Sequence, residues 1–228
     1  VNASATVTNS TISIVRLYSG SPTLTGNAIA SGTPFVMHDP DVDMSGISGN
    51  IFTPSDLRIE ISGSLNDSRT LDFVDGIGQY VYGGDLTVSN GSTLTIAPGV
   101  EIHTTNSNSS VFDLEVYGEL HAAGVLFTGH YDDINVHSGG RADLSDCTFS
   151  GDYAEVTYYA GSSGTVDNLS GEYWDLSINS DQVSIVNGID VDTLNLDSAI
   201  AVTNGTINAL NVNASATVTN STISIVRL

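Results

Sequence analysis

Short apolar runs alternate with Thr, Ser and Asn along almost the whole chain, and small turn residues separate the runs. Strict alternation of apolar and polar residues is the pattern of a β-strand with one buried side. No helical spacing of apolar residues extends over a useful length. The turns take Asn, Asp or Gly, which tolerate the positive φ of a sharp bend. The pattern therefore predicts an all-β fold.

The turns recur at intervals of roughly 16 to 25 residues, which is longer than the spacing of hairpins in a sandwich. Residues 193–209, TLNLDSAIAVTNGTINA, match residues 209–225, ALNVNASATVTNSTISI, after a shift of 16 positions. A chain that returns to the same pattern at this interval is typical of a β-solenoid, whose coils stack about 4.8 Å apart. The expected ladder of turn residues is Asn9, Gly124, Asp146, Asn168, Asn187, Asn204 and Asn220.

The two ends of the chain have the same sequence, because residues 1–17 and residues 212–228 both read VNASATVTNSTISIVRL. The predicted organisation is one continuous solenoid over 1–228, made of a 211-residue repeat (1–211) and the first coil of the next repeat. A duplication at DNA level and a deliberately repeated coil in a recombinant segment are the alternatives. The spacing of the turns predicts about ten or eleven coils. Neither end of the sequence carries a helical or polar cap, so we expect the solenoid to be uncapped at both ends.

Two segments resemble a known family. Residues 83–103, GGDLTVSNGSTLTIAPGVEIH, and residues 114–129, LEVYGELHAAGVLFTG, are similar to right-handed parallel β-helix proteins of the pectate-lyase-like group, many of them prokaryotic surface proteins. The resemblance implies a right-handed coil and an extracellular or cell-surface location. It says little about activity, because this scaffold hosts lyases, glycosidases, adhesins and inert fibres.

The charge balance excludes several partners. The chain has 26 acidic and 5 basic residues, a formal net charge of −21, and all its basic residues are Arg. Nucleic acids and anionic membrane surfaces attract clusters of Lys and Arg, so neither is an expected partner. No run approaches the roughly 18 apolar residues that span a bilayer. The single cysteine, Cys147, excludes an internal disulfide.

Two sets of residues are candidate sites. Asp39, Asp41 and Asp43 alternate along the chain like the first ligands of a calcium loop, although the Gly and Glu of the complete loop are missing. In an extended strand the same three residues would instead form an exposed acidic side. Sequons at Asn66, Asn90 and Asn108 leave N-glycosylation open, whereas the sequon asparagines of the turn ladder are expected to stack on one another.

No set of residues predicts catalysis. The richest acidic segment, residues 129–146, is interpreted as a solvated turn region. We therefore expect a non-enzymatic structural repeat of an extracellular fibre, stalk, sheath or giant adhesin. It continues head-to-tail, either through covalent tandem repeats or through stacked subunits, and possible further partners are neighbouring fibres or cell-surface glycans. The alternative is a polysaccharide-binding or polysaccharide-degrading β-helix, which would show an acidic groove with aromatic residues.

Overall fold

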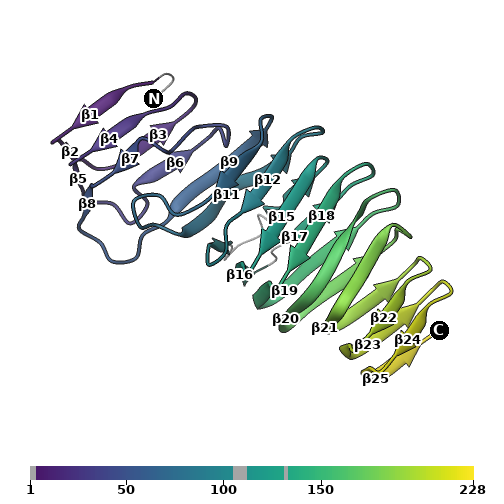
Figure 1. Cartoon of the computed structure of the whole chain (residues 1–228). Helices are drawn as coiled ribbons and strands as arrows, with labels where there is room; N and C mark the ends of the chain where they lie inside the picture. The colour runs from purple at the N-terminus through teal and green to yellow at the C-terminus, as the bar shows by residue number, and fades with distance from the viewer. Residues whose placement is uncertain (1–3, 105–111, 131–132) are drawn as a thin grey trace.

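The computed structural model describes residues 4–104, 112–130 and 133–228, and every regular element in these ranges is a β-strand. The strands follow one another around an elongated coil whose two ends lie far apart (Figure 1). Strands of successive coils pair in parallel. The fold is a β-solenoid of about 8 turns, which confirms the predicted fold class. The hand of the coil stays a prediction.

The strands fall into three parts along the rod (Figure 1). The first part contains β1 (Thr6–Thr8), β2 (Thr11–Ile12), β3 (Val15–Leu17), β4 (Thr23–Thr25), β5 (Ala28–Ile29), β6 (Phe35–Met37), β7 (Ile47–Ser48) and β8 (Ile51–Phe52). The middle contains β9 (Ile59–Leu65), β10 (Arg69–Leu71), β11 (Gln79–Val88), β12 (Thr93–Ile96), β13 (Glu101–His103), β14 (Leu114–Val116), β15 (Glu119–Ala123), β16 (Leu126–His130), β17 (Asp133–Val136), β18 (Arg141–Ser145), β19 (Thr148–Tyr158), β20 (Ser163–Ile178) and β21 (Val183–Leu196). The last part contains β22 (Ala201–Thr203), β23 (Thr206–Val212), β24 (Thr217–Thr219) and β25 (Thr222–Arg227).

The regular turns can be counted along one ladder, to which each turn contributes one residue. Each member pairs with the next in the parallel register, and all but the last are buried. The members are Leu65, Val88, Val116, Val136, Tyr158, Ile178, Leu196 and Val212. The count of about 8 turns is lower than the ten or eleven coils expected from the sequence. That expectation treated the segment before Ile59 as regular coils.

The segment before Ile59 is built differently from the rest. Its short strands form two separate sheets, β1–β4–β7 and β2–β5–β8, and only β3 and β6 extend the long sheet through β9. Strands of two or three residues make few ladder hydrogen bonds. Several later strands are longer, with seven to sixteen residues in β9, β11, β19, β20, β21 and β23.

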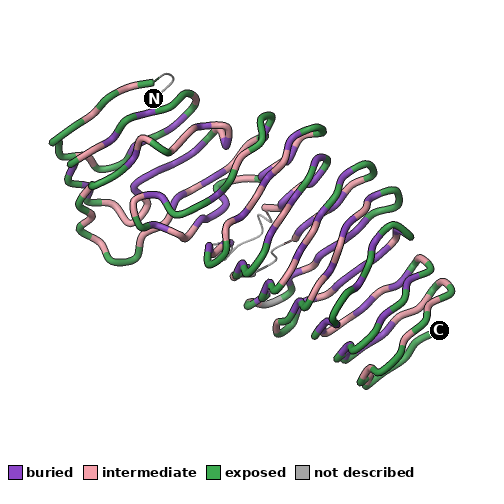
Figure 2. The backbone as a smooth tube through the Cα atoms, viewed as in Figure 1, coloured by how far each residue is buried: buried purple, intermediate pink, exposed green. Residues whose placement is uncertain are grey.

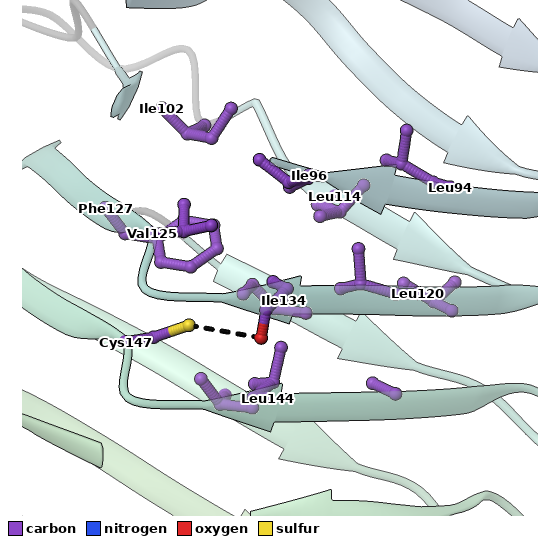
Figure 3. Close-up of a cluster of buried hydrophobic side chains, with 14 of the residues drawn as sticks. Leu94, Ile96, Ile102, Leu114, Leu120, Val125, Phe127, Ile134, Leu144 and Cys147 are labelled. Atoms are coloured by element: carbon purple, nitrogen blue, oxygen red, sulfur yellow. Dashed lines mark hydrogen bonds between the residues drawn. The ribbon is translucent and has the colours of Figure 1, made fainter. Parts of the chain in front are cut away.

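The inside of the rod is filled by one side of every strand. Buried residues alternate with partly or fully exposed ones, as in β12 and β18, and the buried residues form one continuous apolar cluster (Figures 2 and 3). Phe127, Phe149 and Trp174 stack on one another in successive coils, with ring centroids 5.0 and 4.7 Å apart. Cys147 is buried in the same cluster, and its thiol donates to the Ala122 carbonyl at 3.4 Å (Figure 3). Stacking of like residues thus replaces disulfides as the source of cohesion.

The corners of the coil use residues in the left-handed region. All seven turn residues expected from the sequence have φ between 50° and 63°, a conformation that Asn, Asp and Gly adopt at low cost. Asn168 Nδ2 donates to Asp146 Oδ1 at 2.7 Å across two coils. A second ladder, missed from the sequence, joins Asn27 to Asn50 at 2.9 Å and Asn50 to Asp75 at 2.8 Å.

Candidate functional site

One flat side of the rod carries a carboxylate from each of five successive coils. These residues, here named the acid column, are Asp85, Asp113, Asp133, Glu155 and Asp175. The parallel register places Asp133 beside Glu155 and Glu155 beside Asp175, and the Asp113 amide donates to Asp85 Oδ1 at 3.3 Å. The column follows strands β11, β14, β17, β19 and β20. No sequence motif marks it, because the intervals between its members vary from 20 to 28 residues.

Three acids of this column have a raised pKa, mainly because they are partly buried. Partial burial, together with the neighbouring charges of Glu115 and Asp85, raises the pKa of Asp113 to about 6. Partial burial and the charges of Asp113 and Glu155 likewise raise the pKa of Asp133 to about 6. Burial also raises the pKa of Asp175. Asp113, Asp133 and Asp175 therefore release their protons at a higher pH than exposed aspartates do.

A column of amides and hydroxyls runs beside the acid column. Asn211 Nδ2 donates to Asn195 Oδ1 at 2.7 Å, and Asn195 Nδ2 donates to Ser177 Oγ at 3.0 Å. The Ser177 and Thr157 hydroxyls both donate to Glu155 Oε1 at 2.8 Å. These bonds link five residues along the rod axis. Side-chain contacts on the outside therefore reinforce the backbone ladder between coils.

Three rings form the third column on the same side. The ring of His137 stacks between Tyr117 and Tyr159, with centroids 4.2 and 5.2 Å apart, and His137 Nε2 contacts Glu115 Oε2. Because the rings lie face to face along the axis, each covers the face of the next. A sugar stacks on the open face of an aromatic ring, so the two faces of His137 are closed to such a contact.

The columns border a groove of about 590 Å³ that extends from Asp113 to Asn213. Its walls are carboxylates, amides and hydroxyls, and its aromatic residue is Tyr159. No group of three or more His, Cys, Asp or Glu residues suited to a metal ion occurs among the described residues. The groove is therefore a polar surface for hydrogen bonding, with negative charge concentrated at one end.

The predicted calcium residues are occupied by other contacts. Asp39 Oδ1 accepts from the Asp41 amide and Asp43 Oδ1 accepts from the Ser45 amide, each at 3.0 Å. The Asp41 carboxylate accepts from the backbone amides of residues 66 and 67 at 3.0 and 2.9 Å. Each carboxylate thus shapes a turn or joins two coils. A calcium site at these residues stays a prediction, and the observed contacts give it no support.

The predicted glycosylation sites differ in their surroundings. Asn66 and Asn90 are exposed, but Asn66 Nδ2, the atom that would carry a sugar, donates to the Ser64 carbonyl at 2.9 Å. Asn90 lines a shallow hollow beside Tyr117. Asn108 lies outside the described residues. Glycosylation at all three positions stays a prediction.

The C-terminal end of the rod leaves apolar side chains open. Val226 and Leu228 have exposed fractions of 51% and 97%, and their sequence equivalents Val15 and Leu17 have 7% and 0%. In the first copy the coil over 18–37 covers these residues through the pairing of β3 with β6. The last coil of the rod is accordingly exposed along most of its length (Figure 2). The coil over 212–228 is the second candidate site, because a further coil, of the same chain or of another copy, can pair with it as β6 pairs with β3.

No protein-family model, curated protein or solved structure matches the chain. In the described part of the chain no helix is long and apolar enough to cross a membrane. Interpretation of both candidate sites therefore rests on their geometry.

Proposed function

We propose that the chain is a structural repeat unit of an extracellular fibre, stalk, sheath or giant surface adhesin, which assembles by end-to-end continuation of the β-solenoid. One observation supports this most: residues 212–228 repeat residues 1–17, and Val226 and Leu228 form an apolar side that no coil within residues 1–228 covers. Another coil placed on that side would bury both residues, as Val15 and Leu17 are buried. A head-to-tail contact of this kind does not close on itself, so it produces a filament.

The mechanical part of the proposal follows from the interior of the rod. Each coil contacts only its two neighbours, through a parallel ladder and a stacked apolar core. A pull along the axis is therefore shared by the backbone bonds around a whole coil. Such a rod has no need of a disulfide, a metal or a catalytic group.

The finer family assignment belongs to the same proposal. The segments over 83–103 and 114–129 supply the second half of β11, all of β12 to β15 and most of β16, which suits the right-handed, pectate-lyase-like surface proteins that they resemble. A net charge of −21 without any Lys suits an outer surface in salty water. Neighbouring fibres and cell-surface glycans are the proposed further partners.

The test is electron microscopy of the purified chain, with a matched pair of variants. Val226→Asp places a charge on the open end, and Val186→Asp places the same charge on a middle coil, where Val186 has an exposed fraction of 40%. We expect filaments from the parent chain and from Val186→Asp, and single rods from Val226→Asp. Single rods from the parent chain at high concentration would overturn the proposal.

The polar groove supports a second candidate function, binding or cleavage of a polysaccharide. It brings Asp113, Asp133 and Glu155 together in neighbouring coils, and two of these acids have a pKa of about 6, which suits a proton donor. Its negative charge favours neutral or amino sugars over the uronates that pectate lyases cleave. The covered face of His137 argues against a stacking platform.

Calorimetric titration with neutral and cationic oligosaccharides tests the second candidate. Binding that is lost in Asp133→Asn and kept in Asp181→Asn, at an exposed acid outside the groove, would support it. Absence of binding and of released reducing ends would leave the structural function alone.

A further inference from the structure

The acidic residues are confined to the middle of the chain. All 26 lie between Asp39 and Asp197, so residues 1–37 and 198–228 contain none. Two rods side by side would bring their acidic middle segments close together, and the negative charges would repel. Two rods end to end would meet through coils that carry only an Arg. The charge distribution therefore favours contact through the ends.

The structure already contains a coil of this sequence stacked on a near copy of itself. The coil over 197–211 lies directly before the last coil, and four register pairs join identical residues. They are Val202 with Val218, Thr203 with Thr219, Thr206 with Thr222 and Ile207 with Ile223. Like side chains thus fit on one another at the spacing of the ladder.

We propose that residues 215–228 of one copy stack in the parallel register on residues 4–17 of a second copy, so that identical side chains meet across the joint. The proposal rests on the proposed end-to-end assembly, applies to its form as stacked separate chains of residues 1–228, and specifies the register of that stacking. Thr219 lies beside Thr8 of the second copy, Val226 beside Val15, and Leu228 beside Leu17. The contact repeats the one between the last two coils of each rod, and it covers the apolar side of the last coil.

A second kind of joint is possible because residues 4–17 and residues 215–228 have the same sequence. Residues 215–228 of one copy could displace residues 4–17 of the second copy and pair with its strands β4, β5 and β6, as the first coil does. That exchange breaks as many contacts as it makes, because the displaced coil loses its only described neighbour. Stacking adds a contact and breaks none, so it is the favoured arrangement.

One pair in the proposed joint is unfavourable. Arg227 of one copy lies beside Arg16 of the second, and like charges directly opposite in a ladder destabilise it. Arg227 Nη1 donates to Asn211 Oδ1 at 3.3 Å in the preceding coil, which draws its charge away from the joint. We expect Arg16→Glu to lower the concentration at which filaments form severalfold at low salt, and Arg16→Gln to do so less. No change with either variant would show that these residues do not meet.

Pairs of cysteines distinguish the two joints. The control Thr203→Cys with Thr219→Cys joins register partners within one chain, and should form an intramolecular disulfide that proves this spacing suitable. Thr8→Cys with Thr219→Cys reports stacking, and Thr25→Cys with Thr219→Cys reports exchange, since Thr8 pairs with Thr25 in one chain. The natural Cys147 is buried and gives little background. Thr219→Cys alone limits covalent products to dimers.

Non-reducing electrophoresis of oxidised filaments gives the result. We expect disulfide-linked trimers and longer products from Thr8→Cys with Thr219→Cys, and none from Thr25→Cys with Thr219→Cys. The reverse pattern would overturn stacking in favour of exchange. Filaments that form without disulfide-linked trimers in either variant would overturn the proposed register of the joint while leaving end-to-end assembly intact. Failure of all chains to form filaments would overturn the proposed function itself.

Discussion

Residues 4–17 and residues 215–228 are two copies of one sequence with opposite surroundings. The first copy pairs with the coil that follows it and the second with the coil that precedes it. Their local geometry agrees: Asn9 and Asn220 have φ of 50° and 52°, and the hydroxyls of Ser10 and Ser221 each donate to a carbonyl two residues earlier at 2.9 Å. Local conformation therefore follows from the sequence of the coil.

Burial in the two copies follows from the neighbour instead. Leu17 is fully buried and Leu228 is almost fully exposed, although each is the last residue of the same 17-residue segment. A single coil has no interior of its own. In a solenoid the apolar residues gain their stabilising effect only when the next coil is in place, so stability resides in the contacts between coils.

Substitution of the two equivalent leucines should give the largest contrast. Leu17→Ala removes a fully buried side chain and should cost about 2 to 5 kcal/mol in the stability of the first two coils. Leu228→Ala removes a side chain that contacts little, so a dilute, unassembled sample should lose almost nothing. Amide hydrogen exchange of β6, which pairs with β3, measures the local effect. Equal effects of both substitutions would contradict the role assigned to the neighbouring coil.

Substitution at the turn should give a smaller and equal effect in both copies. Asn9→Ala and Asn220→Ala each place a residue with a Cβ and no amide in the left-handed region, which costs about 1 to 2 kcal/mol. Asn9→Gly and Asn220→Gly are the controls and should cost less. Hydrogen exchange of the substituted coil measures each value. A cost in one copy alone would show that the turn conformation depends on the neighbour after all.

Substitution of the serine next to this turn should again cost different amounts of stability in the two copies, but the difference should be smaller. Ser221 Oγ accepts from the Gly205 amide of the preceding coil at 3.0 Å, and loss of this bond in Ser221→Ala should cost about 1 kcal/mol. The Ser10 hydroxyl bonds only within its own exposed turn in the contacts described, so Ser10→Ala should cost a few tenths. Denaturant unfolding with a probe near each end compares them. A larger loss of stability in Ser10→Ala than in Ser221→Ala would contradict the role given to the bond between Ser221 and the Gly205 amide.

The two copies also show what the sequence could predict. Alternation and the Asn, Asp and Gly spacing predicted the parallel solenoid, because period and turn conformation are local properties. The positive φ of Asn9 and Asn220 agrees with that expectation. The acid column was missed, since coils of unequal length conceal which residues meet: Asp133 lies beside Glu155 only because of the register observed.

The expected coil number was too high for a related reason. Turn residues such as Asn9 occur in the first part of the chain, yet most of the strands there form two small sheets beside the long one. Spacing detects a bend but not the sheet that the flanking strands join. The calcium site at Asp39, Asp41 and Asp43 stays a prediction, and the carboxylates of Asp39 and Asp43 each accept a hydrogen bond from a nearby backbone amide.

A change in pH should have the smallest effect on the two copies, because residues 1–37 and 198–228 contain neither acids nor His. The middle coils should respond. Asp113 and Asp133 have a folded pKa of about 6, above the ordinary value of 3.8, so the folded state keeps protons that the unfolded chain has already lost. Stability is therefore highest below about pH 4 with respect to these groups, and falls as the pH rises to about 6.

Hydrogen-exchange protection factors between pH 4 and pH 7, corrected for the intrinsic exchange rate, measure this difference. Protection in β17 and β19 should fall over this range, and protection in β24 and β25 should stay constant. Asp133→Asn should remove part of the fall, whereas Asp181→Asn, at an exposed acid outside the column, should leave it unchanged. A parallel fall in β24 and β25 would mean that acidic repulsion reaches the ends of the rod. In that case the absence of acids there would no longer explain a preference for contact through the ends.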